Sequence, residues 1–154
     1  MIVDASVAAK WFLPNETLDS EATLVRDEAL GDRVRLTAPA IVWPEVAHAI
    51  VGAVRMKRVD PAAAREISAR FPRLRRLVDL AEVDPEEAVR RALRVGVGAN
   101  DAQYLILSAR LGQTLLTADR GLLERGAASG YDVVWLGDVT LRDGVLVDTP
   151  QEYQ

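Results

Sequence analysis

Four acidic residues stand where a predicted strand ends or a predicted helix begins: Asp4, Glu45, Asp101 and Asp119. Asp4 follows the apolar pair IV, and Asp119 follows the apolar run LLTA. Glu45 falls in the first turns of a helix predicted over 41–57, and Asp101 opens a helix after the glycine-rich stretch GVGAN. Ligands of an open parallel sheet bind beyond the carboxyl ends of its strands. We therefore expect the four carboxylates to converge at one edge of the sheet.

Each of these acids also has a purely structural explanation. Asp101 and Asp119 can cap the helices that follow them. Asp4 can form a turn with Ser6. Glu45 can favour the positive end of its helix. Taken singly, each acid is more often structural than functional.

The combination of four acids is harder to explain structurally. Carboxylates brought close together repel one another and raise each other's pKa, and a divalent cation removes that conflict. Oxygen ligands without a cluster of His or Cys favour Mg²⁺ or Mn²⁺ over zinc. Such ions lower the pKa of a bound water, and a pair of them can stabilise the attacking and leaving oxygens of phosphodiester cleavage. The sequence thus predicts a site for one or two such cations.

The elements that must position these acids follow from the patterning of the chain. Strands alternate with helices, which predicts a three-layer α/β/α fold with a central, mainly parallel sheet. The expected strands are 2–4, 35–37, 77–83, 114–117 and 133–136, and the expected helices are 6–13, 18–30, 41–57, 61–72, 85–95, 101–111 and 121–127. We expect a domain over 1–136, with an extension over 137–154 that belongs to the same unit. In that extension, Asp143-Gly144 between alternating residues predicts a β-hairpin.

Size and composition limit the class of protein. A chain of 154 residues can form one domain with a substantial core. The lack of cysteine excludes disulfides and thiolate metal sites and suits a reducing compartment. No run approaches the ~18 apolar residues of a membrane span, and no basic segment precedes the apolar start. We therefore expect a cytoplasmic protein that does not associate with membranes.

The net charge of −4 conceals an uneven distribution. From Arg55 to Arg76 the chain holds eight basic residues and only two acidic ones. Such a block is more often a solvated helix face than a binding track for phosphates. The block therefore permits a polyanionic partner without requiring one.

Three stretches together resemble a known family. IVDASVAAKWFLPNE, APAIVWPEVAHAI and NDAQYLILSARLGQTLLTADRGLL, in this order and spacing, resemble a PIN-domain ribonuclease, and most of all the VapC-type toxins of bacterial toxin–antitoxin pairs. The resemblance runs from the start to about residue 136. It implies that the metal-site acids of the family are Asp4, Glu45, Asp101 and Asp119. It also implies supporting roles for Ser6 and Thr117, whose hydroxyls would orient a ligand or a metal-bound water.

The resemblance implies an activity and its partners. The protein would be a metal-dependent endoribonuclease that acts as the toxin of a pair, with Mg²⁺ or Mn²⁺ as cofactor and RNA as substrate. A VapB-like antitoxin would place a segment, often with an arginine, into the acidic cleft. The basic block would flank that cleft and bind RNA phosphates. A homodimer is also implied, with four aromatic residues placed either in its interface or, more commonly for such residues, in the core: Trp11, Phe12, Trp43 and Phe71.

His48 departs from the family pattern, in which asparagine commonly follows the glutamate by one helical turn. It stands at i+3 from Glu45 and so shares a helix face with it. A lone histidine in this setting is more often a partly buried, hydrogen-bonded residue than a ligand or a base. We therefore expect no catalytic role for His48.

Two other functions compete with the nuclease hypothesis. A phosphatase would use Asp4 as nucleophile, but Asp4 is followed by Ala5 and Ser6 and lacks a second aspartate at i+2. No glycine-rich phosphate loop is present either. The other alternative is a non-catalytic module that receives a basic peptide or RNA in the acidic cleft. Metal binding with RNA hydrolysis would distinguish the nuclease from both.

Overall fold

Five parallel strands form the central sheet of the computed structural model, which describes residues 1–142 and 145–148. In spatial order they are β3 (Val78–Ala81), β2 (Leu36–Pro39), β1 (Ile2–Val3), β4 (Leu115–Thr117) and β5 (Val133–Trp135). All four neighbouring pairs are parallel. The chain runs outward from β1 to β3 and then returns to the other side of β1 for β4. The strand order therefore reverses between β1 and β4, where open sheets of this kind place their ligand sites.

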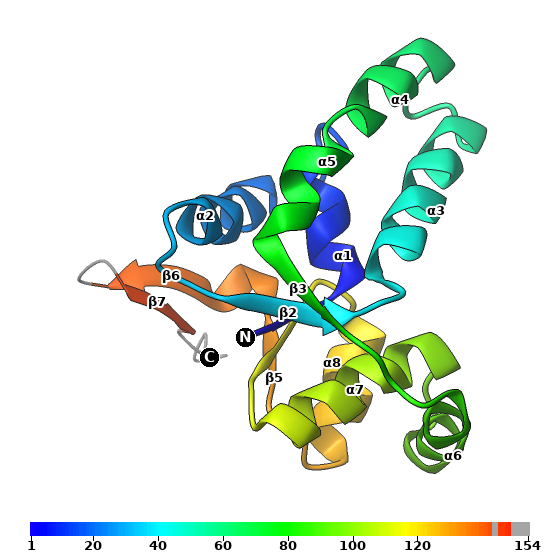
Figure 1. The fold of residues 1–154 in the computed structure, drawn as a ribbon, viewed down its shortest axis with the longest axis vertical. Helices are drawn as coiled ribbons and strands as arrows, with labels where there is room; N and C mark the ends of the chain where they lie inside the picture. Colours follow the sequence, from blue (N-terminus) through cyan, green and yellow to red (C-terminus); the bar gives the residue numbers. More distant parts are fainter. Residues whose placement is uncertain (143–144, 149–154) are drawn as a thin grey trace, which may run out of the picture.

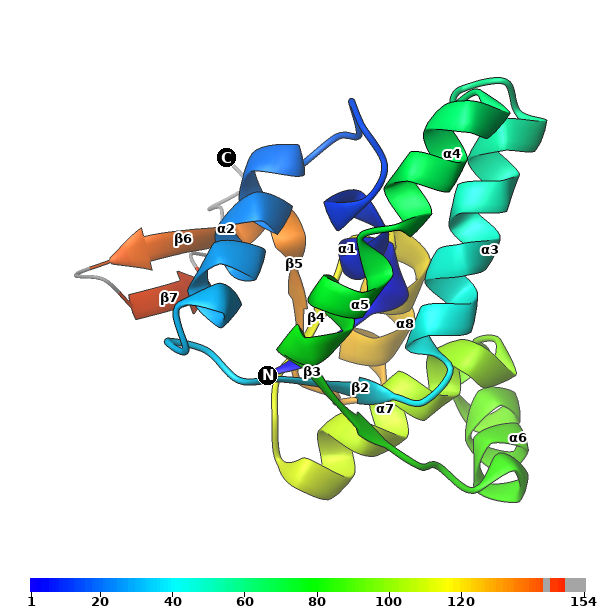
Figure 2. The same ribbon diagram turned by 45° about the horizontal axis from the view of Figure 1, so that its top comes forward.

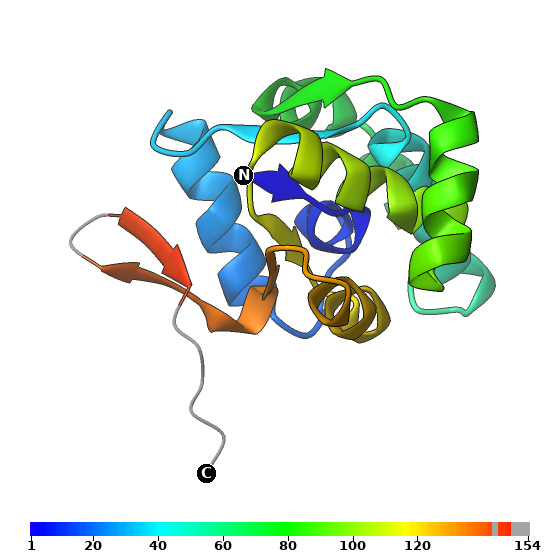
Figure 3. The same cartoon turned by 90° about the horizontal axis from the view of Figure 1, so that it is seen from below.

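Helices cover both faces of this sheet, which confirms the predicted three-layer α/β/α fold. In Figure 1, α1, α2 and α3 lie on one side of the strands and α6 and α7 on the other, and Figure 3 shows α7 crossing the sheet as seen from below. The helices are α1 (Ala5–Ala8), α2 (Asp19–Leu30), α3 (Val42–Arg55), α4 (Pro61–Ser68), α5 (Phe71–Leu74), α6 (Pro85–Val95), α7 (Ala99–Leu111) and α8 (Arg120–Ala128). Helices α3 and α4 lie side by side and extend away from the sheet (Figure 2).

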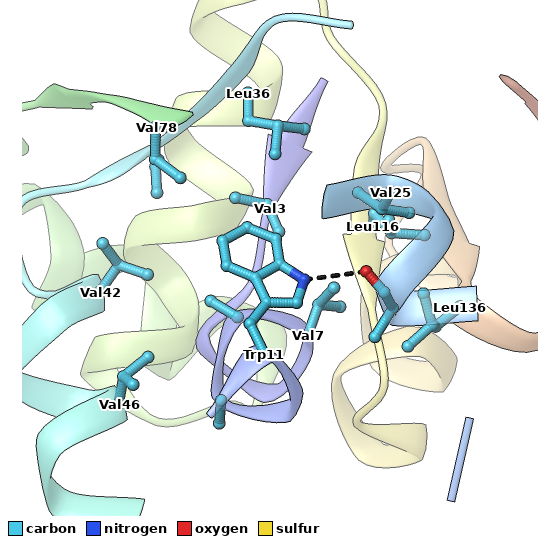
Figure 4. Close-up of a cluster of buried hydrophobic side chains, with 14 of the residues drawn as sticks. Val3, Val7, Trp11, Val25, Leu36, Val42, Val46, Val78, Leu116 and Leu136 are labelled. Carbon is cyan, nitrogen blue, oxygen red and sulfur yellow. Dashed lines mark hydrogen bonds between the residues drawn. The ribbon is translucent and has the colours of Figure 1, made fainter. Parts of the chain in front are cut away.

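The core lies between the sheet and the first group of helices. Trp11 projects from the 3₁₀ turn after α1, and its indole N–H donates a 2.9 Å hydrogen bond to the carbonyl of Ala22 (Figure 4). Phe12 and Trp43 are also buried, with their ring centroids 6.4 Å apart, and the Phe12 ring lies 4.5 Å from the half-buried Phe71 ring, centroid to centroid. These aromatic residues pack inside the chain. The suggestion that they form a dimer interface is therefore wrong for Trp11, Phe12 and Trp43.

Three predicted helices differ from those observed. The helix expected over 6–13 is the short α1, which a 3₁₀ turn continues as far as Trp11. The helix expected over 61–72 ends at Ser68, and Pro72 lies instead in the first turn of α5, where its missing N–H costs no hydrogen bond. Asp101 does not open its helix, because α7 begins at Ala99 and the N-cap is Gly98. Asp101 is the third residue of α7, and its carboxylate accepts a hydrogen bond from the Gly98 N–H at 3.3 Å.

The chain continues beyond the central sheet into a separate pair of strands. β6 (Val139–Arg142) and β7 (Val145–Asp148) pair in antiparallel fashion, while the turn predicted at Asp143-Gly144 lies outside the described residues. Within the part of the chain that the structure describes, no helix combines the length and apolar character needed to cross a membrane.

Candidate active site

Asp4 lies at the end of β1, at the point where the strand order reverses. Its backbone remains extended and its N–H donates to the carbonyl of Leu116 in β4 at 3.0 Å. The side chain is only 5% exposed. Its Oδ2 accepts hydrogen bonds from the hydroxyls of Ser6 at 2.5 Å and Thr117 at 2.7 Å. Asp4 is therefore a buried carboxylate bound by neutral donors.

The same two hydroxyls also accept hydrogen bonds from the backbone after β4. The Ala118 N–H donates to Ser6 Oγ and the Asp119 N–H donates to Thr117 Oγ1, each at 2.9 Å. Ser6 and Thr117 thus connect the carboxyl ends of β1 and β4 and hold the Asp4 side chain between them. The supporting positions suggested for these residues are compatible with this network, although their contact is with the carboxylate itself.

Burial raises the pKa of Asp4 from its ordinary 3.8 to about 6. Removal from water is the main cause, and the Ser6 and Thr117 hydrogen bonds oppose it. The negative charges of Glu45 and Asp101 raise the pKa further. Among the described residues, no lysine, arginine or histidine forms an ion pair with any of the four candidate acids. The described residues therefore leave the charge of Asp4 without a cationic partner.

Glu45, in the first turn of α3, is held by two residues of α7. Its Oε2 accepts a hydrogen bond from the Tyr104 hydroxyl at 2.6 Å, and its Oε1 accepts one from the Asn100 amide at 3.0 Å. Tyr104 is fully buried, and burial together with the charges of Asp4 and Glu45 raises the pKa of its hydroxyl. The Tyr104 hydroxyl is thus protonated and acts as donor. These contacts join helices from opposite faces of the sheet.

The sequence interpretation did not identify Asn100 or Tyr104 as site residues. One pattern pointed to Tyr104: it stands at i+3 from Asp101 and so shares a face of α7 with it. Nothing in the sequence indicated that its partner would be Glu45, which is 59 positions away.

Asp101 and Asp119 each contact the backbone at a helix start. Burial and the charge of Asp119 raise the pKa of Asp101, while the Gly98 hydrogen bond and the charge of Arg125 lower it. The Oδ1 of Asp119 accepts hydrogen bonds from the Gly121 and Leu122 N–H groups at 2.7 and 3.1 Å, so Asp119 caps α8. The structural explanation for Asp119 is therefore correct. The helix cap uses only one of its two carboxylate oxygens.

The four acids share one electrostatic environment at the carboxyl edge of the sheet. The charges of Glu45 and Asp101 raise the pKa of Asp4, and the charge of Asp119 raises the pKa of Asp101. The side chains are not gathered into a ready-made cage: within the described residues, no group of three or more His, Cys, Asp or Glu could hold a metal ion as placed. Mutual repulsion opposes closer approach of carboxylates that have no cation between them.

The donor set nevertheless fits a hard divalent cation. Three of the acids retain a carboxylate oxygen without a hydrogen bond to the described part of the chain: Asp4 Oδ1, Asp101 Oδ1 and Asp119 Oδ2. Mg²⁺ and Mn²⁺ prefer such oxygens and usually keep several water ligands as well.

His48 does not have the environment expected for it. Its side chain is exposed on α3, and it makes no hydrogen bond with any described residue. The prediction of a partly buried, hydrogen-bonded histidine is wrong, because the helix turns this position toward solvent. Its exposure agrees with its absence from the candidate catalytic residues.

The basic block does not flank the acidic edge as a unit. Arg76 lines a pocket with Arg35 and Leu36, where β2 and β3 begin, at the opposite edge of the sheet. Arg70 and Arg73 line a groove against α2. The helix break after Ser68 separates these arginines from the acids. Arg58, by contrast, lines a pocket together with Ser6, the residue that donates a hydrogen bond to Asp4.

Fold and site together define a class of protein: an open, parallel α/β domain that presents acidic residues where its strand order reverses. Within that class, the chain belongs to the PIN domain family, whose model matches residues 1–128. The predicted family is therefore confirmed. A comparison with curated protein sequences gave no match.

Three solved structures share this fold. PAE2754 from Pyrobaculum aerophilum has 24% sequence identity and a TM-score of 0.64, with 88% of each chain covered. VapC20 from Mycobacterium tuberculosis, described as a Sarcin-Ricin loop cleaving toxin, has 17% identity and a TM-score of 0.58, over 84% of this chain and 95% of that one. FitAcB from Neisseria gonorrhoeae has 13% identity and a TM-score of 0.56, over 86% and 94%. At these identities the likeness is one of fold.

Proposed function

We propose that this PIN domain is a metal-dependent endoribonuclease and the toxin of a toxin–antitoxin pair. The observation that carries the proposal is the state of Asp4, a carboxylate 5% exposed, surrounded by other acids and paired with no cation of the described chain. A fold that retains an uncompensated buried charge at its ligand-binding edge is suited to an external cation. The similarity to VapC20, a toxin described as cleaving the Sarcin-Ricin loop, supports RNA as the substrate.

The residues that would hold the ion are Asp4, Glu45, Asp101 and Asp119. When bound, Mg²⁺ or Mn²⁺ supplies Lewis-acid charge that activates water and stabilises the departing oxygen of a phosphodiester. Ser6 and Thr117 occupy Oδ2 of Asp4 and leave Oδ1 available. Tyr104 and Asn100 fix the Glu45 carboxylate, so that its position does not depend on the ion.

The partners follow from the same proposal. A VapB-like antitoxin would inhibit the enzyme by placing a cationic side chain among the acids, where an arginine could form charge-assisted hydrogen bonds with two carboxylates. The similarity to FitAcB and VapC20 supports such a partner. We further propose a cytoplasmic homodimer, with the PIN domain over 1–136 and the extension over 137–154 as part of the same unit.

The experiment that tests the proposal is RNA cleavage by Asp101→Asn, with Asp84→Asn as matched control. Asp84 also stands at a helix start and its carboxylate accepts a backbone N–H, that of Glu86 at 3.0 Å, but it lies outside the acidic group. We expect Asp101→Asn to lower the rate about a thousandfold, because metal-ion catalysis contributes several kcal/mol. Growth inhibition should be lost in parallel, and Asp84→Asn should retain both.

Three outcomes contradict the proposal, each in its own way. Full activity of Asp101→Asn with Mg²⁺ or Mn²⁺ would show that Asp101 is not part of the site. RNA binding without turnover in the wild type would favour a non-catalytic module. A trapped phospho-aspartate at Asp4 would favour a phosphatase.

A further inference from the structure

A positively charged pocket adjoins the acidic edge, the edge of the sheet that carries Asp4, Glu45, Asp101 and Asp119. Its volume is about 230 Å³. It is lined by Ser6, a supporting residue of the candidate site, by Ala118, which follows Thr117, and by three charged side chains, Lys10, Glu16 and Arg58. Ser6 therefore belongs to both places: its hydroxyl donates to Asp4, and the same residue lines this pocket. The remaining lining residues are alanines and a leucine, which lower the local polarity and strengthen ionic contacts.

The ammonium group of Lys10 is the unusual feature of this pocket. The Lys10 side chain is only 9% exposed, yet Nζ lies 3.9 Å from its nearest carboxylate oxygen, Glu16 Oε2, and donates no hydrogen bond to a described residue. Glu16 is already engaged, since its Oε1 accepts a hydrogen bond from Arg58 at 2.5 Å. One carboxylate thus faces two cations. The pocket therefore keeps a net positive charge. The stem of Lys10 is largely covered, and its ammonium group is left to donate to a ligand or to water.

Local structure fixes Lys10 relative to the acidic edge. Asp4 precedes α1 and Lys10 lies in the 3₁₀ turn that continues it, so both belong to one short, buried segment. Arg58 reaches the pocket from the turn between α3 and α4, and Glu16 from the loop before α2. The pocket is therefore built from the segments that carry the site.

We propose that this pocket binds the RNA phosphate next to the scissile one, and that Lys10 is a positioning residue for the substrate. The inference rests on the proposed nuclease function. An RNA strand that approaches four carboxylates is repelled by them, and a cationic pocket beside them offsets the repulsion and fixes the strand. A phosphate supplies the acceptors that the Lys10 ammonium lacks, and Glu16 keeps Arg58 in place as a second cation.

The test compares binding and cleavage of a fluorescein-labelled, single-stranded RNA that contains one mapped cleavage site. Lys10→Met should raise KM, and the Kd measured in EDTA, about tenfold, which corresponds to one charge-assisted contact, while kcat changes little. The slope of log Kd against log salt should fall by about 0.7, as expected for one lost phosphate contact with a single strand. Lys10→Arg should restore most of the affinity. Arg94→Met, which removes an exposed charge from α6, is the matched control and should leave Kd and KM unchanged.

A change in the RNA locates the contact independently of protein stability. Replacing the phosphate on either side of the scissile bond by a neutral methylphosphonate, one position at a time, should weaken binding to the wild type at one position. Lys10→Met should be insensitive to the same replacement. If Lys10→Met folds poorly, Lys10→Gln, which also removes the charge, takes its place in this comparison.

The outcomes separate this inference from the proposed function. Equal RNA affinity of Lys10→Met and the wild type, or a methylphosphonate effect that is identical in both, overturns the role of Lys10 while cleavage by the wild type stands. A loss of antitoxin binding with unchanged RNA binding assigns the pocket to the protein partner and also overturns the inference. If the wild type neither binds nor cuts RNA in any of these assays, the nuclease function itself fails.

Discussion

Two buried carboxylates of this molecule show opposite behaviour. Glu28, on α2, is 4% exposed and accepts two hydrogen bonds from Arg33, at 2.7 and 2.8 Å, which lower its pKa. Asp4, at the sheet edge, is 5% exposed and accepts hydrogen bonds only from hydroxyls, and burial raises its pKa to about 6. Equal burial therefore does not imply an equal role. The chain supplies a cation for the acid on α2, whereas no described residue supplies one for the acid at the sheet edge.

The largest expected effect comes from Asp4→Asn, which removes the buried charge and keeps an acceptor for Ser6 and Thr117. In the metal-free protein at pH 7, the free energy of unfolding should rise by about 3 kcal/mol, because the pKa is shifted by about two units and each unit corresponds to about 1.4 kcal/mol. Denaturation with urea at pH 7 and at pH 4 measures this gain.

The sign and the pH range of this effect follow from the direction of the shift. Folded protein binds the Asp4 proton more tightly than the unfolded chain does, so the unfolding free energy of the wild type falls as pH rises from 3.8 to about 6 and stays low above that range. The difference between variant and wild type should therefore disappear near pH 4. A variant that is no more stable at pH 7 would show that the Asp4 charge is compensated.

Metal binding should offset the loss of stability that the buried charge of Asp4 causes. At pH 7, Mn²⁺ at 100 times its dissociation constant should raise the unfolding free energy of the wild type by about 2.7 kcal/mol. The response should shrink at pH 5, because the ion competes with the proton of Asp4, whose pKa is about 6. Differential scanning calorimetry measures this response. Asp84→Asn should keep it in full and Asp4→Asn should lose most of it; an equal response in both would place the ion elsewhere.

The matching substitution on α2, Glu28→Gln, should have the opposite sign. It removes the charge that Arg33 pairs with, so the unfolding free energy should fall rather than rise. The decrease should be smaller than the gain from Asp4→Asn, because the Arg33 side chain is 55% exposed and water screens the pair. It should persist above pH 4.5 and vanish as pH falls below it, since a lowered pKa stabilises the fold only while the acid is charged. Urea denaturation across pH 3 to 7 tests this; stabilisation at pH 7 would end the contrast between the two acids.

The smallest expected effect tests how neutral donors hold the site. Tyr104→Phe removes the hydroxyl that donates to Glu45 and should lower the unfolding free energy by about 1 kcal/mol. RNA cleavage should fall about tenfold, as for other groups that orient metal ligands. Tyr131→Phe is the matched control, since its hydroxyl bonds Arg91 away from the acidic edge. Loss of stability without loss of cleavage would limit Tyr104 to a structural role.

The sequence allowed the acidic edge to be predicted because it depends on strands. Apolar runs that end at Asp4 and Asp119 reveal where strands stop, and parallel order places those ends together. The family assignment rested on the same segments. Exact helix starts were less accessible, because α7 begins at Ala99 through the backbone conformation of Gly98 rather than through a side-chain cap.

Features that depend on tertiary contacts were not predictable in this way. The Glu45–Tyr104 contact joins two helices on opposite faces of the sheet, which no local pattern encodes. The basic block is continuous in the sequence but divided in space. Helix α4 ends at Ser68, and the chain then turns and brings Arg76 to the start of β3. The spacing of charges along a chain shows which side chains are close in sequence. It does not show at which edge of the sheet they lie.

The pairing of β1 with β4 has a consequence for protein synthesis. Thr117 lies 113 positions after Asp4 in the chain, and their hydrogen bond forms only when β4 lies beside β1. A growing polypeptide on the ribosome has Asp4 from the start but cannot complete the Asp4 pocket until the segment around Thr117 has emerged and folded. The buried environment of Asp4 is therefore completed late in synthesis, after most of the domain has been made.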